Sequence, residues 1–270
     1  MKLCEISRAK PPLPKMVPRQ LPEGFKTVQE FLQAKCPIAY NSELEIYRGV
    51  SVKHPGEIIY SNSLTAMRKS ANTKNWYTLL MDNILPEWAA YPKRSQSFIC
   101  STSERRANDF HRGKPDVHGK QSIGEVYRVY PIGNPNIGIC PAMDLWFSFS
   151  NIGAQYIAPA FRELAGYAGL PNVDNLETLK QILDYYDSRW AKKATQNLVH
   201  NILWEFMDTE DVTFGNYTSL TNLLEYVLSP TYNGFELKKL SSLDNYSMVS
   251  REVWFSGPAY FVPINLPPNS

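Results

Sequence analysis

Three short segments, far apart in the sequence, combine residue types that can act together on a phosphorylated substrate. They are Ile46–Gly49, Ser97–Glu104 and Ser250–Phe255. The first contains an arginine, whose planar guanidinium binds phosphate oxygens in pairs and is not deprotonated in proteins. The second contains a cluster of small hydroxyl groups. The third contains a glutamate, whose carboxylate can stabilise positive charge that develops in a transition state.

Each segment is an apolar run with polar residues at one end, which is typical of a strand that ends at a site. The sequence predicts strands over Glu45–Val52, Ser97–Ser101 and Glu125–Pro131, and again around Val253–Phe255 and Tyr260–Val262. Helices are expected over Thr27–Ala34, residues 62–85 and Glu104–Phe110. The three segments can therefore form one site only if a sheet brings their strands together.

The chain changes character between about residues 150 and 245. Apolar spacing there, as at Leu179, Ile182 and Leu183, predicts amphipathic helices, and Asp174 with Glu177 fits a capping box at the start of one of them. Strand runs with segregated helices favour an α+β fold, in which this block is a helical insertion. We expect residues 25–270 to form a single domain, preceded by a proline-rich arm over residues 1–24.

The composition is that of an ordinary globular chain. Of its 270 residues, 43% are hydrophobic and 20% are charged, which is enough for a sizeable core. The formal net charge of +2 is too small to indicate a nucleic-acid partner through bulk electrostatics, although a local basic groove is compatible with it. No apolar run has the length of a membrane span, so we expect no membrane partner.

The cysteines and the remaining motifs exclude several kinds of site. Cys4, Cys36, Cys100 and Cys140 have no paired spacing and no neighbouring histidine pattern, so no metal is expected. Cys100 and Cys140 lie in apolar runs and should be buried free thiols. The chain has no Walker loop, no dinucleotide-binding glycine motif and no nucleophile elbow. Its start lacks the apolar region of a signal peptide, and we expect a cytoplasmic protein.

In their order and wording, Tyr47–Gly49, Ser101–Ser103 and Glu252 resemble the ADP-ribosyltransferases of the Arg-Ser-Glu type. The resemblance covers about residues 40–131 and 248–264. It implies an ADP-ribosyltransferase-like split β-sheet core that carries the helical insertion. It also implies an enzyme that uses NAD+ as substrate, breaks the nicotinamide glycosidic bond and transfers ADP-ribose to a macromolecular acceptor, either protein or nucleic acid. The habits of the family suggest a phage-encoded or bacterial effector.

The resemblance places the first segment against the dinucleotide. Arg48 is expected at the NAD+ phosphates, with Tyr47 beside it and with Gly49 allowing a close approach of the backbone. An aromatic side chain is expected against the nicotinamide, and Phe110, Tyr47 and Trp254 are the candidates. Considered alone, Arg48 could also be a strand arginine that pairs with a surface carboxylate.

The resemblance places the other two segments at the bond that breaks. Ser101 is expected to orient the catalytic glutamate, while Thr102 and Ser103 support the ribose or cap the helix that follows. Glu252 is expected to bind the ribose 2′-hydroxyl and to stabilise the cation that forms as nicotinamide leaves. An exposed strand-end glutamate is the simpler alternative for Glu252. If the resemblance holds, Arg48, Ser101 and Glu252 line one cleft.

The acceptor side departs from the family. Many members have Glu or Gln two residues before the catalytic glutamate, and Ser250 occupies that place here. A serine can hydrogen-bond an acceptor, but it cannot act as a carboxylate base. Arg94 is a second candidate on this side, either as a phosphate or acceptor contact or as part of a surface loop. An NAD+ glycohydrolase, a catalytically inactive transferase-like binding module and an unrelated α+β interaction protein stay open as alternatives.

Overall fold

The computed structural model describes residues 17–19, 21, 24–52, 56–65, 75–111, 123–152, 157–171, 175–206, 216–243 and 249–264. The other residues lie outside the described part of the chain. They include most of the proline-rich arm expected over residues 1–24, together with Cys4 and Asp174.

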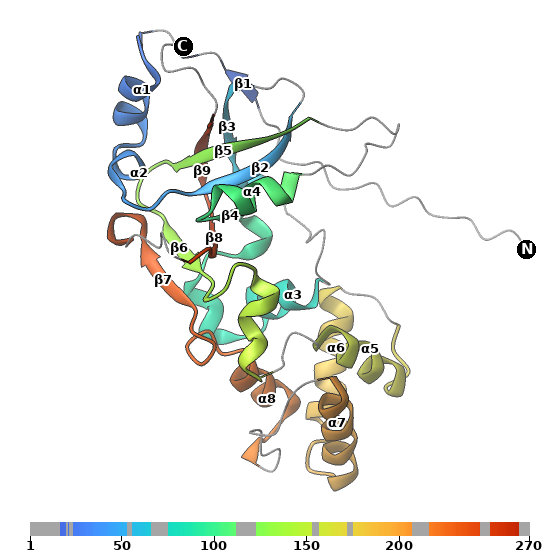
Figure 1. Cartoon of the computed structure of the whole chain (residues 1–270). Coiled ribbons are helices and arrows are strands. Elements are labelled where there is room, and N and C mark those ends of the chain that lie inside the picture. Colours follow the sequence, from blue (N-terminus) through green and yellow to red (C-terminus); the bar gives the residue numbers. More distant parts are fainter. Residues whose placement is uncertain are drawn as a thin grey trace, which may run out of the picture.

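One antiparallel sheet forms the upper part of the molecule (Figure 1). Its described strands are β1 (Val17–Arg19), β2 (Tyr47–Val52), β3 (Ile58–Asn62), β4 (Phe98–Ser101), β5 (Ile123–Pro131), β6 (Asn136–Ile139), β7 (Glu236–Lys239), β8 (Glu252–Phe255) and β9 (Pro258–Pro263). They lie side by side in the order β1-β3-β9-β5-β2-β4-β8-β6-β7. The strands expected around residues 45–52, 97–101, 125–131, 253–255 and 260–262 are therefore confirmed.

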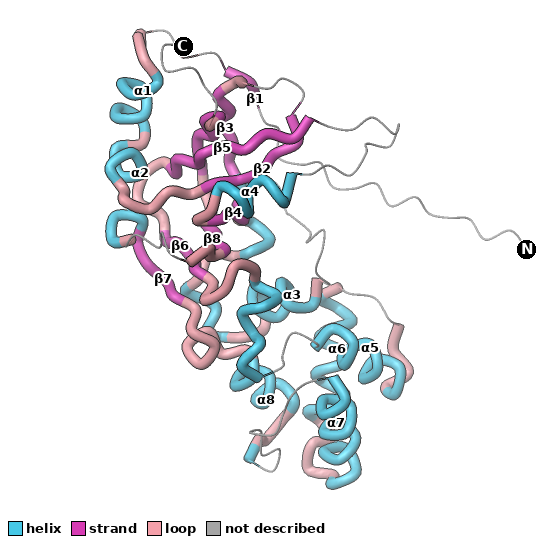
Figure 2. The backbone as a smooth tube through the Cα atoms, viewed as in Figure 1, coloured by secondary structure: helices cyan, strands magenta, loops and turns pink. Residues whose placement is uncertain are grey.

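Helices lie beside the sheet and fill the lower part of the molecule, as the cyan segments of Figure 2 show. The α-helices of the described chain are α1 (Val28–Lys35), α2 (Pro37–Asn41), α3 (Trp76–Asn83), α4 (Glu104–His111), α5 (Ile157–Tyr167), α6 (Leu176–Asp187), α7 (Lys193–Phe206) and α8 (Leu220–Val227). The described 3-10 segments are η1 (Ser63–Thr65), η2 (Pro86–Ala90), η3 (Arg94–Gln96), η4 (Leu145–Ile152) and η7 (Leu240–Ser242). Strands and segregated helices together confirm the α+β class.

Three local predictions need correction. The helix expected over residues 62–85 is found only as α3: Asn62 ends β3 by pairing with Pro258, a 3-10 turn follows, and residues 66–74 lie outside the described part of the chain. The block expected to be helical up to about residue 245 ends earlier, since β7 adds to the edge of the sheet beside β6. The N-cap of α6 is Asn175, whose side chain accepts a hydrogen bond from the Thr178 amide, and no capping box through Asp174 is needed.

The sheet separates two hydrophobic cores. Alternate residues of a strand point to opposite faces, and on β8 this places Val253 and Phe255 in one core and Trp254 in the other. The first core is closed by α1, through Phe31 and Leu32. The second core belongs to the helical lobe, which contains α3 and α5–α8. Glu252 shares its face with Trp254, so it lies on the side of the helical lobe.

A close approach between β6 and β8 fixes the position of Trp254. Gly138 pairs with Trp254, and a Cβ atom at Gly138 would lie 2.3 Å from two atoms of the indole ring. Only glycine leaves room for the indole to lie against β6 in this way. The ring nitrogen of Trp254 donates a hydrogen bond of 2.8 Å to the Pro92 carbonyl, which ties the chain before β4 to the same strand.

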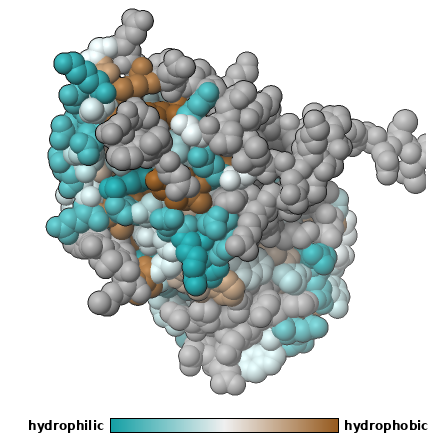
Figure 3. Space-filling view, turned by 45° about the horizontal axis from the view of Figure 1, so that its top comes forward, coloured by the Kyte–Doolittle hydropathy of each residue, from teal (hydrophilic) through white to brown (hydrophobic). Residues whose placement is uncertain are grey.

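The surface of the described residues is mixed. Figure 3 shows polar side chains over much of the visible described face, with smaller apolar patches between them. Within the described part of the chain, no helix combines the length and the apolar character that crossing a membrane requires.

Candidate active site

The structure brings the three motif segments onto neighbouring strands. β4 lies between β2 and β8, Tyr47 pairs with Ser101, and Ser101 pairs with Glu252. Directly paired residues of antiparallel strands point to the same face of the sheet. Tyr47, Ser101 and Glu252 therefore form one row across three strands, although they come from distant parts of the sequence. Arg128 of β5 pairs with Tyr47 and extends the row by one strand.

Glu252 forms a buried ion pair at the end of this row. Its Oε1 atom accepts a hydrogen bond of 2.6 Å from Nη1 of Arg94. Only 4% of Glu252 and 8% of Arg94 are exposed to solvent. The Cys140 thiol also faces Oε1, at 3.8 Å. The glutamate is thus neither an exposed strand-end carboxylate nor a partner of Arg251, which pairs with Glu236 instead.

Arg94 is held in place from three directions. The backbone amides of Arg94 and Ser95 both donate to the carboxylate of Asp82 on α3, at 2.8 Å and 2.9 Å. The guanidinium lies 5.1 Å from the centre of the Trp254 ring, within the range of a cation–π contact. Glu252 completes the enclosure. The interpretation of Arg94 as part of a surface loop is therefore wrong, and its burial is the feature that local sequence did not reveal.

The hydroxyl cluster supports the backbone around Glu252. Ser101, which is 1% exposed, accepts a hydrogen bond of 3.1 Å from the Ser103 amide through Oγ. Oγ1 of Thr102 accepts from the Arg251 amide at 3.0 Å, and the Thr102 amide donates to the Arg251 carbonyl at 3.0 Å. Among the described residues, no hydrogen bond joins Ser101 directly to Glu252. Oγ of Ser103 accepts a hydrogen bond of 3.4 Å from the Arg106 amide, as expected for an N-cap of the following helix, α4.

The Arg48 side chain leaves the row. As the neighbour of Tyr47 on β2, it starts from the opposite face of the sheet. Its Nη1 atom donates to the Ile99 carbonyl, and its guanidinium lies 5.9 Å from the centre of the Phe98 ring. β2 and β4 share a single paired position, so they part beyond it and leave the Ile99 carbonyl free to accept. The structure thus places Ser101 and Glu252 together on one face of the sheet and starts Arg48 from the other face, at the split between β2 and β4. The prediction that all three residues line one cleft is therefore wrong for Arg48.

A second polar cluster lies at the other end of the row. Arg128 pairs with Glu45 at 2.6 Å, and the Tyr47 hydroxyl donates to the same carboxylate. Burial, followed by the hydrogen bond to Glu45, raises the pKa of Tyr47, so this phenol stays protonated at neutral pH. Sequence reasoning assigned Arg128 to a strand without a role in the site. Its alternation with Tyr127 and Val129 was visible, but the register that aligns it with Tyr47 was not.

The remaining candidates have mixed outcomes. Gly49 pairs with Val126 of β5. Phe110 belongs to α4, but its side chain lies outside the described residues. The Ser250 hydroxyl is buried and has no hydrogen-bond partner among the described residues. Cys100 and Cys140 are buried free thiols, as expected, and burial raises the pKa of Cys140 well above its usual range.

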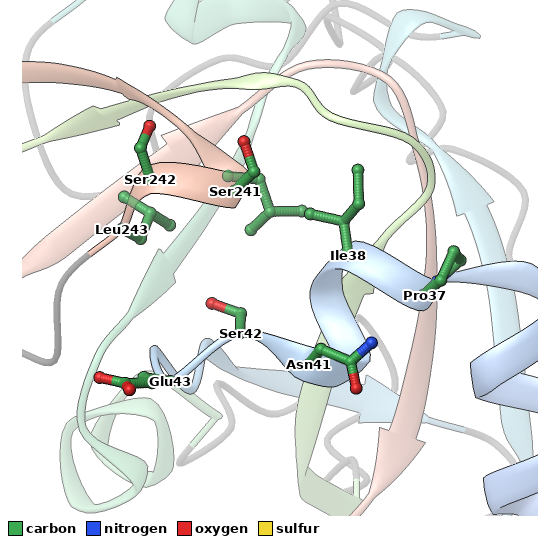
Figure 4. Close-up of a pocket in the computed structure, with 9 residues that line it drawn as sticks. Pro37, Ile38, Asn41, Ser42, Glu43, Ser241, Ser242 and Leu243 are labelled. Atoms are coloured by element: carbon green, nitrogen blue, oxygen red, sulfur yellow. The ribbon is translucent and has the colours of Figure 1, made fainter.

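A groove of about 740 Å³ lies elsewhere, between α2 and η7. Figure 4 shows Asn41, Ser42 and Glu43 on one side of it and Ser241 and Ser242 on the other. None of the predicted site residues lines this groove. We therefore do not assign this groove to the site around Glu252.

Comparisons of the chain with protein-family models, with curated proteins and with solved structures found no match. Function is therefore inferred from the geometry around Glu252 and from the resemblance of the three motif segments.

Proposed function

We propose that this protein is an NAD+-dependent ADP-ribosyltransferase, built on a split β-sheet core with a helical insertion between β6 and β7. One observation carries the proposal: Tyr47, Ser101 and Glu252 lie in a single row on β2, β4 and β8. The three motifs on which the resemblance depends were predicted to meet, and their strands are immediate neighbours. If the likeness of the three short segments were accidental, their strands would have no reason to be neighbours.

Glu252 is proposed to act at the bond that breaks. Among the described residues, both partners of its carboxylate contact Oε1, so Oε2 is left for a substrate hydroxyl. Oε2 would accept a hydrogen bond from the ribose 2′-hydroxyl. As nicotinamide leaves, positive charge develops on the ribosyl ring, and a fixed carboxylate in a water-poor site stabilises that charge strongly. Ser101, in register with Glu252, limits where the ribose can lie.

Arg48 is proposed to bind the diphosphate at the split between β2 and β4. In the described structure only Nη1 of its guanidinium has a hydrogen-bond partner, the Ile99 carbonyl. The other N–H groups of the planar fork are left for phosphate oxygens. Because Arg48 starts from the opposite face of the sheet, the dinucleotide would run from Glu252 across Tyr47 and enter the split between β2 and β4 to reach its guanidinium.

Binding requires the site to open. Ser101 and Glu252 are almost fully enclosed. The segment after β6 is one of the elements around them, because the Glu252 amide donates to the Ala142 carbonyl and the next residue, Met143, contacts Arg106 of α4. We propose that the contact between Arg106 of α4 and Met143 breaks when NAD+ enters.

Two further candidate functions each have an observation in their favour. Ser250 replaces the acceptor-side Glu or Gln of the family, which favours transfer to water and an NAD+ glycohydrolase. The buried pair of Glu252 with Arg94 favours a catalytically inactive transferase-like module, in which the pair only stabilises the fold. The acceptor of a true transferase would be a protein or a nucleic acid.

The test is NAD+ cleavage by matched variants. The protein is incubated with NAD+ labelled in the adenylate moiety and with cell lysate, and both released nicotinamide and transferred label are measured. Glu252→Gln is expected to lower nicotinamide release by about 100-fold or more, the loss typical of removing one group that stabilises transition-state charge. Glu177→Gln makes the same change on the exposed surface of α6 and should have no effect.

Each outcome selects one function. Label on protein or nucleic acid supports a transferase, and nicotinamide release without transfer supports a glycohydrolase. NAD+ binding without cleavage, measured by calorimetry, supports the inactive module. If Glu252→Gln cleaves NAD+ as fast as the wild type, the role given to Glu252 is wrong.

A further inference from the structure

We propose that Arg94 is a positioning residue for the catalytic carboxylate: it fixes Oε1 of Glu252, so that Oε2 faces the ribose. This inference rests on the proposed function and deepens it, because Arg94 was a candidate only for an acceptor contact. Its side chain is 9% exposed and its partner's is 5% exposed, so neither faces an acceptor in the described structure.

The geometry favours fixing the carboxylate over binding a substrate. Arg94 could bind a ligand only by releasing Glu252, with which it shares a hydrogen bond of 2.6 Å. Its backbone is clamped by Asp82, and its guanidinium lies over Trp254. A residue held by its backbone, by a ring and by an ion pair has little freedom to follow a substrate. It can, however, define the orientation of the group that it holds.

The electrostatics lead to the same conclusion. Burying a charge costs several kcal/mol, and a buried carboxylate without a counter-charge takes up a proton more readily. Within the part of the chain that the structure describes, the titratable groups that act on the pair are Cys140, on Oε1 of Glu252, and Asp144, through its effect on Arg94. A carboxyl group and a thiol never carry a positive charge, so neither Asp144 nor Cys140 can replace that of Arg94. Arg94 therefore supplies the positive charge that faces the buried carboxylate of Glu252.

A stabilising role alone would not require this pair. Well-packed apolar residues often stabilise a core as well as a buried ion pair does, whereas removing one member of the pair leaves an uncompensated charge. A carboxylate that must be ionised for catalysis does require a fixed cation. The two interpretations thus differ in their effect on turnover and on its pH dependence.

The experiment compares Arg94→Met and Arg94→Lys with wild type, using the full chain and the NAD+ cleavage assay. Arg94→Met is expected to lower kcat by about 100-fold or more, with the KM for NAD+ changed by less than about threefold, because Oε2 is misplaced and the dinucleotide contacts are not. The acidic limb of its pH–rate profile should move to higher pH, because the counter-charge is lost. Arg94→Lys keeps the charge and should restore the position of that limb while recovering only part of kcat.

Arg189→Met serves as the matched control. Arg189 lies on the exposed surface of the helical lobe over the Tyr185 ring, and its loss should leave kcat and the pH profile unchanged. A folded Arg94→Met variant with wild-type kcat and an unmoved acidic limb would overturn the inference. Circular dichroism of each variant establishes that it is folded.

A substrate-free measurement separates failure of this inference from failure of the proposed function. Urea unfolding of Arg94→Met, Glu252→Gln and the double variant gives the coupling between the two residues. The double variant removes both charges, so it should fold even if Arg94→Met alone does not. We expect a coupling of at least about tenfold in the unfolding equilibrium constant. If wild type does not cleave NAD+, the proposed function fails; if the coupling is absent, the pair does not exist as described and the inference fails whatever the activity.

Discussion

Gly138→Ala tests the packing of Trp254 against β6, which positions the strand that carries Glu252. The new Cβ atom would lie 2.3 Å from two atoms of the Trp254 ring and 2.8 Å from a third. Ordinary carbon contacts begin near 3.5 Å, so the ring or the strand must move by about 1 Å. The indole is fully buried and hydrogen-bonded to Pro92, so it has no free direction in which to move. Overpacking of this kind destabilises by about 1–3 kcal/mol.

The assay is urea unfolding followed by circular dichroism, with Gly166→Ala as the matched control. Gly166 lies in α5, and no atom would come within 4 Å of its Cβ. The same substitution there should stabilise the protein by about 0.5–1 kcal/mol, because alanine favours a helix over glycine. The two variants are therefore expected to shift the unfolding free energy in opposite directions. A Gly138→Ala protein at least as stable as wild type would refute the described contact between Trp254 and β6.

The remaining predictions concern the arginines of the site and its buried thiol. Arg48→Ala should raise the KM for NAD+ by about tenfold or more, whereas Arg128→Ala should leave it nearly unchanged. The opposite result would mean that the diphosphate binds at Arg128 and not at the split between β2 and β4. Iodoacetamide at pH 8 should not modify Cys140 in the folded protein, since burial raises the pKa of its thiol, and mass spectrometry should find it modified only after unfolding. The same raised pKa predicts that stability falls as the pH rises past the thiol's ordinary value of 9.0, because the unfolded chain then loses a proton that the folded chain keeps; a rise in stability there would contradict the burial.

Much of the fold could be predicted because its signals are local. Alternation along Glu125–Pro131 and the apolar run before Ser101 were sufficient to find β5 and β4. One of the strands that were missed has a weak pattern of its own. β7 is the polar stretch Glu236–Lys239, and it becomes a strand by pairing with β6 at the edge of the sheet. Such strands depend on a distant partner, which no short window of sequence contains.

The site was predictable in its parts and not in its assembly. The three motif segments could be recognised, and Ser103 as a helix cap follows from local chemistry. The partner of Glu252 could not be found in this way. Arg94 lies in a stretch that looks like a surface loop, and it becomes buried only because Asp82, Trp254 and the helical lobe surround it.

By itself, the sequence determined which side chains were available for chemistry and at the end of which strand each of them would lie. The tertiary structure decided which of them share a face. A shift of register by one residue moves a side chain to the other side of a sheet, so pairing placed Tyr47 and Arg128 in the row of Glu252 and directed Arg48 away from it. Pairing between strands is a long-range property, because its free energy depends on contacts between residues far apart in the chain.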